Sequence, residues 1–168
     1  MDIAGPRGFD GAMDAQGSHD EDLDSDGQID ATISVTSRQT HHEGAHPGDD
    51  LEVTTVEEVD LDGDGHADLV ATTVTTYLDL DGDGEIDEIH ETTTTRTDVD
   101  GDGVVDIVDI VATTSRDLHH DGHFEVVDQW EATGVDLDGD GTIDADEIVV
   151  DHVSAHTHED PPEADPEP

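Results

Sequence analysis

The sequence contains no cysteine and no lysine, and both absences narrow what the protein can do. Without cysteine there are no disulfides and no thiolate metal sites. Its basic residues, apart from histidine, are four arginines against 48 aspartates and glutamates, a formal net charge of -44. Nucleic acids and anionic membranes bind through clustered lysine and arginine, so neither is expected as a partner. Divalent cations are the expected partners; the sequence names no protein or glycan partner.

Apolar and aromatic residues are also scarce, at 31% and 2% of the chain. By charge and hydropathy alone such a chain would be disordered, because burial could not offset a backbone entropy cost of about 1–2 kcal/mol per residue. Bound ions can make up this deficit, since binding to a site that exists only in the folded state stabilises that state. No apolar run approaches the roughly 20 residues of a membrane-spanning helix. No secretory signal is visible at the N-terminus.

A nine-residue pattern, D-x-D-x-D-G-x-x-D, recurs in five intact copies at multiples of 19 residues. A sixth, decayed copy begins at Asp117, and a seventh is expected from Gln39, because TSRQTHHEG parallels TSRDLHHDG. The intact copies begin at Asp22, Asp60, Asp79, Asp98 and Asp136. We therefore expect a repeat domain of seven loop-strand units (21–154). A disordered acidic tail (1–20) would precede it, and a disordered acidic, proline-rich tail (155–168) would follow.

The pattern suits calcium, a hard cation that takes six to eight oxygen ligands at about 2.3–2.6 Å. Carboxylates at positions 1, 3, 5 and 9 can surround one ion, while glycine at position 6 makes the turn that brings in the carbonyl of position 7. We expect about five ions, and magnesium is less suited because it demands stricter octahedral geometry. The predicted ligands, with position 7 acting through its backbone carbonyl, are Asp22, Asp24, Asp26, Gln28 and Asp30; Asp60, Asp62, Asp64, His66 and Asp68; Asp79, Asp81, Asp83, Glu85 and Asp87; Asp98, Asp100, Asp102, Val104 and Asp106; and Asp136, Asp138, Asp140, Thr142 and Asp144.

These nine residues resemble the first three-quarters of the EF-hand calcium loop. The last copy, DLDGDGTIDADE, matches all twelve positions of that loop, and the resemblance implies that Glu147 is a bidentate ligand. The other intact copies lack this glutamate and have strand-like flanks, so a helix-opening sensor is not expected. The loops of FG-GAP, VCBS and thrombospondin type 3 repeats are also similar, over roughly residues 22–154. They imply structural calcium in a secreted or cell-surface module; the compartment is otherwise open and could be the cytoplasm.

The connectors between loops are rich in threonine, valine and isoleucine, which favours strands and an all-β fold. Two architectures fit: an antiparallel meander, in which each loop reverses the chain, and a β-solenoid, in which each unit is one coil. All odd-numbered loops are intact, while two of the three even ones carry histidines, and this alternation favours the meander. We expect apolar residues at loop positions 2 and 8 to pack inward, namely Leu61, Leu80, Val99 and Leu137, and Ile29, Ile86, Val105, Phe124 and Ile143.

Histidine is the remaining unusual component, with twelve residues, most of them clustered around 41–46, 119–123 and 152–158. Imidazole suits zinc, nickel or copper, so a second metal class is one interpretation; the other is that two loops lost their calcium affinity and drifted. In the decayed loop the candidate ligands are Asp117, His119, Asp121 and Glu125. No motif predicts catalysis. The sequence thus leaves a calcium-stabilised structural or interaction module, a calcium buffer or store, and a histidine-based metal binder as hypotheses.

Overall fold

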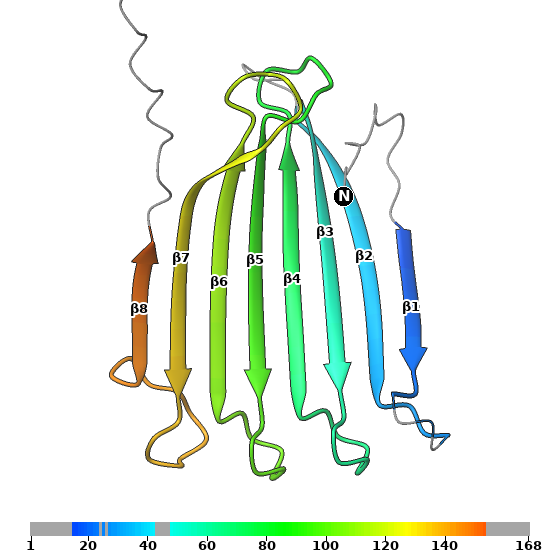
Figure 1. Cartoon of the computed structure of the whole chain (residues 1–168), viewed down its shortest axis with the longest axis vertical. Coiled ribbons are helices and arrows are strands. Elements are labelled where there is room, and N and C mark those ends of the chain that lie inside the picture. The colour runs from blue at the N-terminus through cyan, green and yellow to red at the C-terminus, as the bar shows by residue number, and fades with distance from the viewer. Residues whose placement is uncertain (1–14, 24, 26, 43–47, 154–168) are drawn as a thin grey trace, which may run out of the picture.

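The protein is a single antiparallel β-sheet. The computed structural model describes residues 15–23, 25, 27–42 and 48–153, and these form one eight-stranded sheet in which every strand pairs with its neighbour in sequence (Figure 1). The strands are β1 (Ala15–Glu21), β2 (Ala31–His42), β3 (Gly48–Val59), β4 (Leu69–Leu78), β5 (Glu88–Thr97), β6 (Ile107–Arg116), β7 (Glu125–Val135) and β8 (Ile148–Val153). The predicted meander is confirmed, and the solenoid alternative is wrong. No described segment forms a helix able to cross a membrane.

The meander sorts the loops onto two ends of the sheet, as the alternation of intact and histidine-bearing copies predicts. End A, at the bottom of Figure 1, carries the β1–β2 loop (22–30), the β3–β4 loop (60–68), the β5–β6 loop (98–106) and the β7–β8 loop (136–147). End B, at the top, carries the β4–β5 loop (79–87) and the β6–β7 loop (117–124). The β2–β3 hairpin also closes at end B, where His42 pairs with Gly48.

Two predicted boundaries differ from the structure. Gln39–His42 belong to β2 and pair with residues 48–51 of β3, so the loop expected from Gln39 does not begin there. Its first position lacks the aspartate that accepts backbone N–H groups in the other loops, and the strand therefore continues. At the N-terminus, β1 begins at Ala15, inside the predicted tail, because its backbone pairs along the edge of β2. The rest of that tail, residues 43–47 and the predicted C-terminal tail lie outside the described residues.

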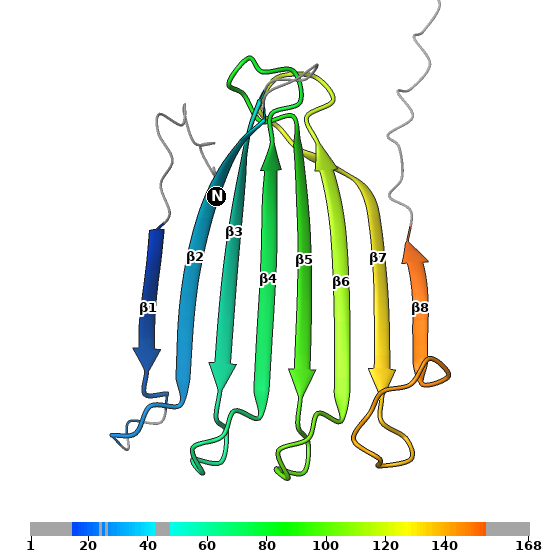
Figure 2. The same ribbon diagram turned by 180° about the vertical axis from the view of Figure 1, so that it is seen from behind.

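The sheet is one layer thick, and no other described element covers either face, as the view from behind also shows (Figure 2). Among the described residues, Ala31 and Ala132 are the only buried hydrophobic ones. Apolar side chains instead line up across the strands beside end A, where the register brings Ala31, Val59, Leu69, Ile107 and Val135 into one row interrupted by Thr97. Such a sheet lacks the packed interior on which an ordinary domain depends.

The predicted inward packing of the loop residues is wrong for position 2. Leu61 and Leu137 are 74% and 77% exposed, and the other second-position side chains named above are exposed as well. The reason lies in the backbone: the N–H of Leu61 donates into the loop, to Asp68 Oδ2 at 2.5 Å, and the side chain is left outside. Of the five residues predicted to pack inward at position 8, Ile86, Val105, Phe124 and Ile143 are half-buried and Ile29 is exposed.

Polar contacts on the faces add cross-strand support. The most enclosed is that of Glu88, which is 6% exposed and accepts hydrogen bonds from His90 and from Arg116 Nε, the latter at 2.5 Å. Burial raises the pKa of Glu88, but these two partners outweigh it and leave the pKa below its ordinary value. Elsewhere Thr73 and Thr93 join their hydroxyls at 2.9 Å across β4 and β5. These contacts fix register locally but do not replace a core.

Candidate metal centres

Each described loop turns through two left-handed residues, at positions 4 and 6. In the β3–β4 loop these are Gly63 and Gly65, with φ of 75° and 90°. The need for glycine at position 6 was predicted from the sequence but that at position 4 was not, although four intact copies read D-G-D-G. Two loops place another residue there, Ser25 (φ 66°) and His120 (φ 51°). Side chains are disfavoured in this conformation, so these two positions carry strain that glycine would avoid.

We therefore expect His120→Gly to stabilise the protein by about 1 kcal/mol, because it removes a left-handed non-glycine residue. The matched control is His123→Gly in the same loop, at a position that does not have a positive φ; there glycine only adds freedom to the unfolded chain and should give no gain. Urea denaturation of the three proteins measures the difference. Equal effects of the two substitutions would show that strain at position 4 is not the cause.

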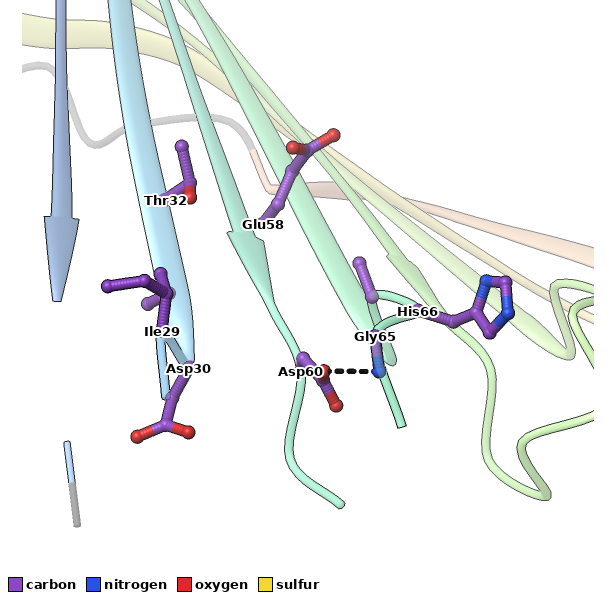
Figure 3. A pocket seen from close by; sticks show the side chains of 9 residues that line it. Ile29, Asp30, Thr32, Glu58, Asp60, Gly65 and His66 are labelled. Carbon is purple, nitrogen blue, oxygen red and sulfur yellow. Dashed lines mark hydrogen bonds between the residues drawn. The ribbon is translucent and has the colours of Figure 1, made fainter. Parts of the chain in front are cut away.

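The first aspartate organises each loop by accepting two backbone N–H groups. Asp60 Oδ1 accepts from Gly63 and Asp60 Oδ2 from Gly65, both at 2.8 Å, as Figure 3 shows for Gly65. The remaining carboxylates also accept backbone hydrogen bonds. The carboxylate at position 3 accepts from the N–H of position 5, and the carboxylate at position 5 accepts from the N–H of position 7. The carboxylate at position 9 accepts from the N–H of position 2. The loops beginning at Asp79 and Asp98 repeat all of these bonds. Backbone hydrogen bonds within each loop thus orient the carboxylates.

In four loops three carboxylates bring one oxygen each to within 4.8 Å of one another. Oxygens on opposite sides of a calcium ion are about 4.6–5.2 Å apart, twice the Ca–O distance, so the spacing fits this cation. The groups are Asp60, Asp62 and Asp68; Asp79, Asp81 and Asp87; Asp98, Asp100 and Asp106; and Asp136, Asp138 and Glu147. Positions 1, 3 and 9 of the predicted ligand set come together in the first three of these loops.

The fifth position is placed differently. Asp64, Asp83, Asp102 and Asp140 belong to none of these groups within the described residues. Each instead accepts the N–H of the seventh residue, as Asp64 Oδ1 does from His66 at 2.8 Å. The imidazole of His66 points away from the Asp60 carboxylate (Figure 3), so a contribution from this residue would come through its backbone carbonyl, as the sequence predicts. The ligand role of positions 5 and 7 remains a prediction.

The β1–β2 loop is described only in part, because Asp24 and Asp26 lie outside the described residues. Its remaining aspartates follow the pattern of the complete loops. Asp22 Oδ2 accepts from Gly27 at 2.9 Å, and Asp30 Oδ2 accepts from Leu23 at 2.6 Å. Positions 1 and 9 of this loop therefore make the same backbone contacts as in the complete loops, and its calcium site remains a prediction.

The β7–β8 loop closes through Glu147 and not through Asp144. Glu147 Oε1 accepts the N–H of Leu137 at 2.8 Å, the contact that the ninth aspartate makes elsewhere. Its other oxygen accepts the N–H of Asp144 at 2.9 Å, and the carboxylate of Asp144 is not a member of the converging group. The loop is three residues longer than the others, and this length lets the glutamate reach the ring. The resemblance to the EF-hand loop implied a role for Glu147, but only the structure shows it replacing Asp144 in the group.

The pKa values of the aspartates differ between the β7–β8 loop and the decayed β6–β7 loop. Repulsion, first from Asp140, raises the pKa of Asp138 above its ordinary value, and a bound cation would offset this repulsion. The pKa of Asp117 in the β6–β7 loop shifts in the opposite direction. Slight burial raises this pKa, but hydrogen bonds from backbone N–H groups, first that of Gly122, outweigh the effect of burial and leave the pKa below its ordinary value. With His119 in place of an aspartate, this loop has less charge for a cation to neutralise.

The histidines form no centre within the described part of the chain. His119 Nε2 lies 3.9 Å from Glu125 Oε1, but no histidine joins a group of three converging ligand atoms there. His46, His156 and His158 lie outside the described residues, and so do the side-chain positions of His41, His42 and His152. The described residues therefore contain no cluster of histidines that supports the predicted site for zinc, nickel or copper.

Comparison with known proteins gives one match. Residues 135–149, which contain the β7–β8 loop, match the family model described as EF hand. No curated protein and no solved structure matches the chain. The family model covers only this loop and its immediate flanks, while the same carboxylate arrangement recurs in three further loops. The match and the recurring groups together indicate that the protein binds calcium.

Proposed function

We propose that the protein is a calcium-stabilised structural or interaction module, in which calcium drives folding of the sheet and makes it rigid. The observation that carries the proposal is the contrast between the sheet and its ends. The sheet is a single layer with two small buried apolar residues, both alanine, among those described. The loops at both ends hold converging carboxylates. We expect the ions to supply the stability that apolar packing does not.

Charge supports the same conclusion. Each complete intact loop places at least four carboxylates within about a dozen residues, and without a counter-ion their repulsion opposes loop closure. A calcium ion would turn that repulsion into attraction at the point where two strands are joined. Five ions would bring ten positive charges against a net charge of -44, leaving about -34. The filled protein would stay strongly acidic, and the proposal assigns it no catalytic role.

Calorimetric titration with calcium tests the proposal, and we expect about five sites per chain. The double substitution Asp98→Asn and Asp100→Asn should remove one site, because it neutralises two members of one group. The control is Glu52→Gln with Glu57→Gln, two exposed carboxylates of β3 outside the loops, which changes charge equally and should leave the stoichiometry unchanged. Titration followed by circular dichroism adds the folding role. Uptake of calcium without any gain of β-structure would contradict that role and indicate a buffer or store.

A further inference from the structure

The loops at end A are joined to one another by backbone hydrogen bonds. The N–H of Asp60 donates to the carbonyl of Asp30 at 2.8 Å, across the gap between the β1–β2 and β3–β4 loops. The same bond recurs at 2.9 Å between the next two pairs of loops. Each one links the first aspartate of a loop to the last aspartate of a loop two strands earlier; the later pairs are Asp98 with Asp68, and Asp136 with Asp106.

These bonds connect residues that define neighbouring centres. The donor is the aspartate whose carboxylate organises its own loop, and the acceptor belongs to the aspartate that closes the loop before it. Figure 3 shows Asp30 and Asp60 at the ends of adjacent strands, lining a pocket of about 290 Å³ to which Ile29 and Gly65, from the two loops, also contribute. An ion that fixes the backbone of one loop therefore also fixes one partner of the bond to the next loop.

We propose that the calcium centres at end A fill as a coupled row, in which occupancy of one loop raises the affinity of its neighbours beyond what folding of the whole sheet contributes, while the β4–β5 centre at end B responds to that row only through this folding. The inference rests on the proposed calcium function. The physical basis is conformational entropy. Binding of the first ion orders the backbone that links two loops, so binding of the next ion loses less conformational entropy and is more favourable. Coupling between nearest neighbours is the behaviour expected of a one-dimensional array of repeats.

Electrostatic repulsion between bound ions opposes this coupling, and its dependence on salt concentration allows the coupling to be detected. Loops two strands apart lie about 10 Å from each other, twice the strand spacing, so bound ions repel across roughly one Debye length at 0.1 M salt. Added salt screens this repulsion and leaves the backbone bonds unchanged, so coupling within the row should increase with ionic strength. The two ends are separated by strands of ten residues, about 33 Å long. Direct electrostatic coupling between the ends is therefore small.

Nuclear magnetic resonance can read the centres one at a time through the position-6 glycines. The N–H groups of Gly65, Gly103 and Gly141 at end A, and of Gly84 at end B, each donate to the first aspartate of their own loop. Their amide signals, followed during a calcium titration of the full chain, give a midpoint for each loop. In the variant Asp98→Asn with Asp100→Asn, we expect the midpoints of Gly65 and Gly141 to rise about fivefold. The midpoint of Gly84 responds only through folding of the whole sheet and should move less than about twofold; its calcium-dependent signal also shows that the variant folds.

The matched control removes the centre at end B, with Asp79→Asn and Asp81→Asn, and should leave the three end A midpoints within about twofold of their original values. Repeating both titrations at 0.5 M salt should enlarge the contrast, as argued from screening. Equal shifts at the two ends, or no shift at Gly65 and Gly141, would overturn the coupled row while leaving calcium binding intact. Glycine amides that ignore calcium in the unaltered protein would overturn the proposed function itself.

Discussion

Chelation of calcium by EDTA will convert the protein from a β-sheet into a largely unfolded chain at neutral pH. A site filled at a free calcium concentration 100 times its Kd stabilises the folded state by about 2.7 kcal/mol. Five such sites contribute about 13.5 kcal/mol, which is as large as the whole stability of an ordinary domain, about 5–15 kcal/mol. A sheet with two buried apolar side chains among its described residues has little else to set against the loss.

Far-ultraviolet circular dichroism and thermal melting, each with calcium and with EDTA, measure this effect. Adding calcium in excess of the chelator should restore the sheet, whereas magnesium should restore it poorly, because its octahedral geometry and reluctance to lose water fit these loops less well. Sodium chloride provides the control for general screening of the -44 net charge and should recover only part of the signal. A sharply melting β-sheet that persists in EDTA would refute the stabilising role.

The strand order could be predicted from the sequence because the chain repeats. A loop every 19 residues leaves about ten residues for each strand, and the alternation of intact and histidine-bearing loops indicates two distinct ends. In a meander, consecutive hairpins face opposite ends by necessity, so the two loop classes separate in space as they do in sequence. Local rules were sufficient here because all strand pairs are between neighbours in the chain.

Side-chain placement could not be predicted in the same way. Leu61 and Leu137 would be buried only in a fold that has an interior. In a single-layer sheet there is no interior for them, and the backbone bond from position 2 to the closing carboxylate turns these side chains outward. The pattern of apolar residues therefore predicted the strands correctly, but it predicted the packing of loop position 2 incorrectly. The apolar row beside end A depends on the register between strands, which a single strand does not reveal.

The extent of each carboxylate group also needed the structure. The D-x-D-x-D-G-x-x-D pattern treats positions 1, 3, 5 and 9 alike, yet position 5 is turned toward the backbone N–H of position 7. Sequence spacing does not show which of several nearby carboxylates reach a common point. The same limit applies to the β7–β8 loop, where two acidic residues compete for one place.

Substitutions at these two acidic residues should therefore differ in their effect on calcium binding. Glu147→Ala should lower the calcium affinity of the β7–β8 loop by about tenfold or more, since residues that hold a metal site in place contribute on that scale. The substitution removes a carboxylate from the converging group and also the acceptor for the N–H groups of Leu137 and Asp144. Asp144→Ala should have a much smaller effect, because its carboxylate is not a member of that group.

The two variants differ by the same kind of change, removal of one carboxylate from the same loop, so long-range charge cannot explain a difference between them. The amide signal of Gly141 reports directly on this centre, since its N–H donates to Asp136 Oδ2 at 2.8 Å. In every other complete intact loop the ninth residue is an aspartate that closes a nine-residue ring, and there the corresponding substitution, such as Asp106→Ala, should act like Glu147→Ala. If Asp144→Ala instead weakened calcium binding as much as Asp106→Ala does, position 9 would be the closing residue throughout, and the longer ring of the β7–β8 loop would have no role in binding.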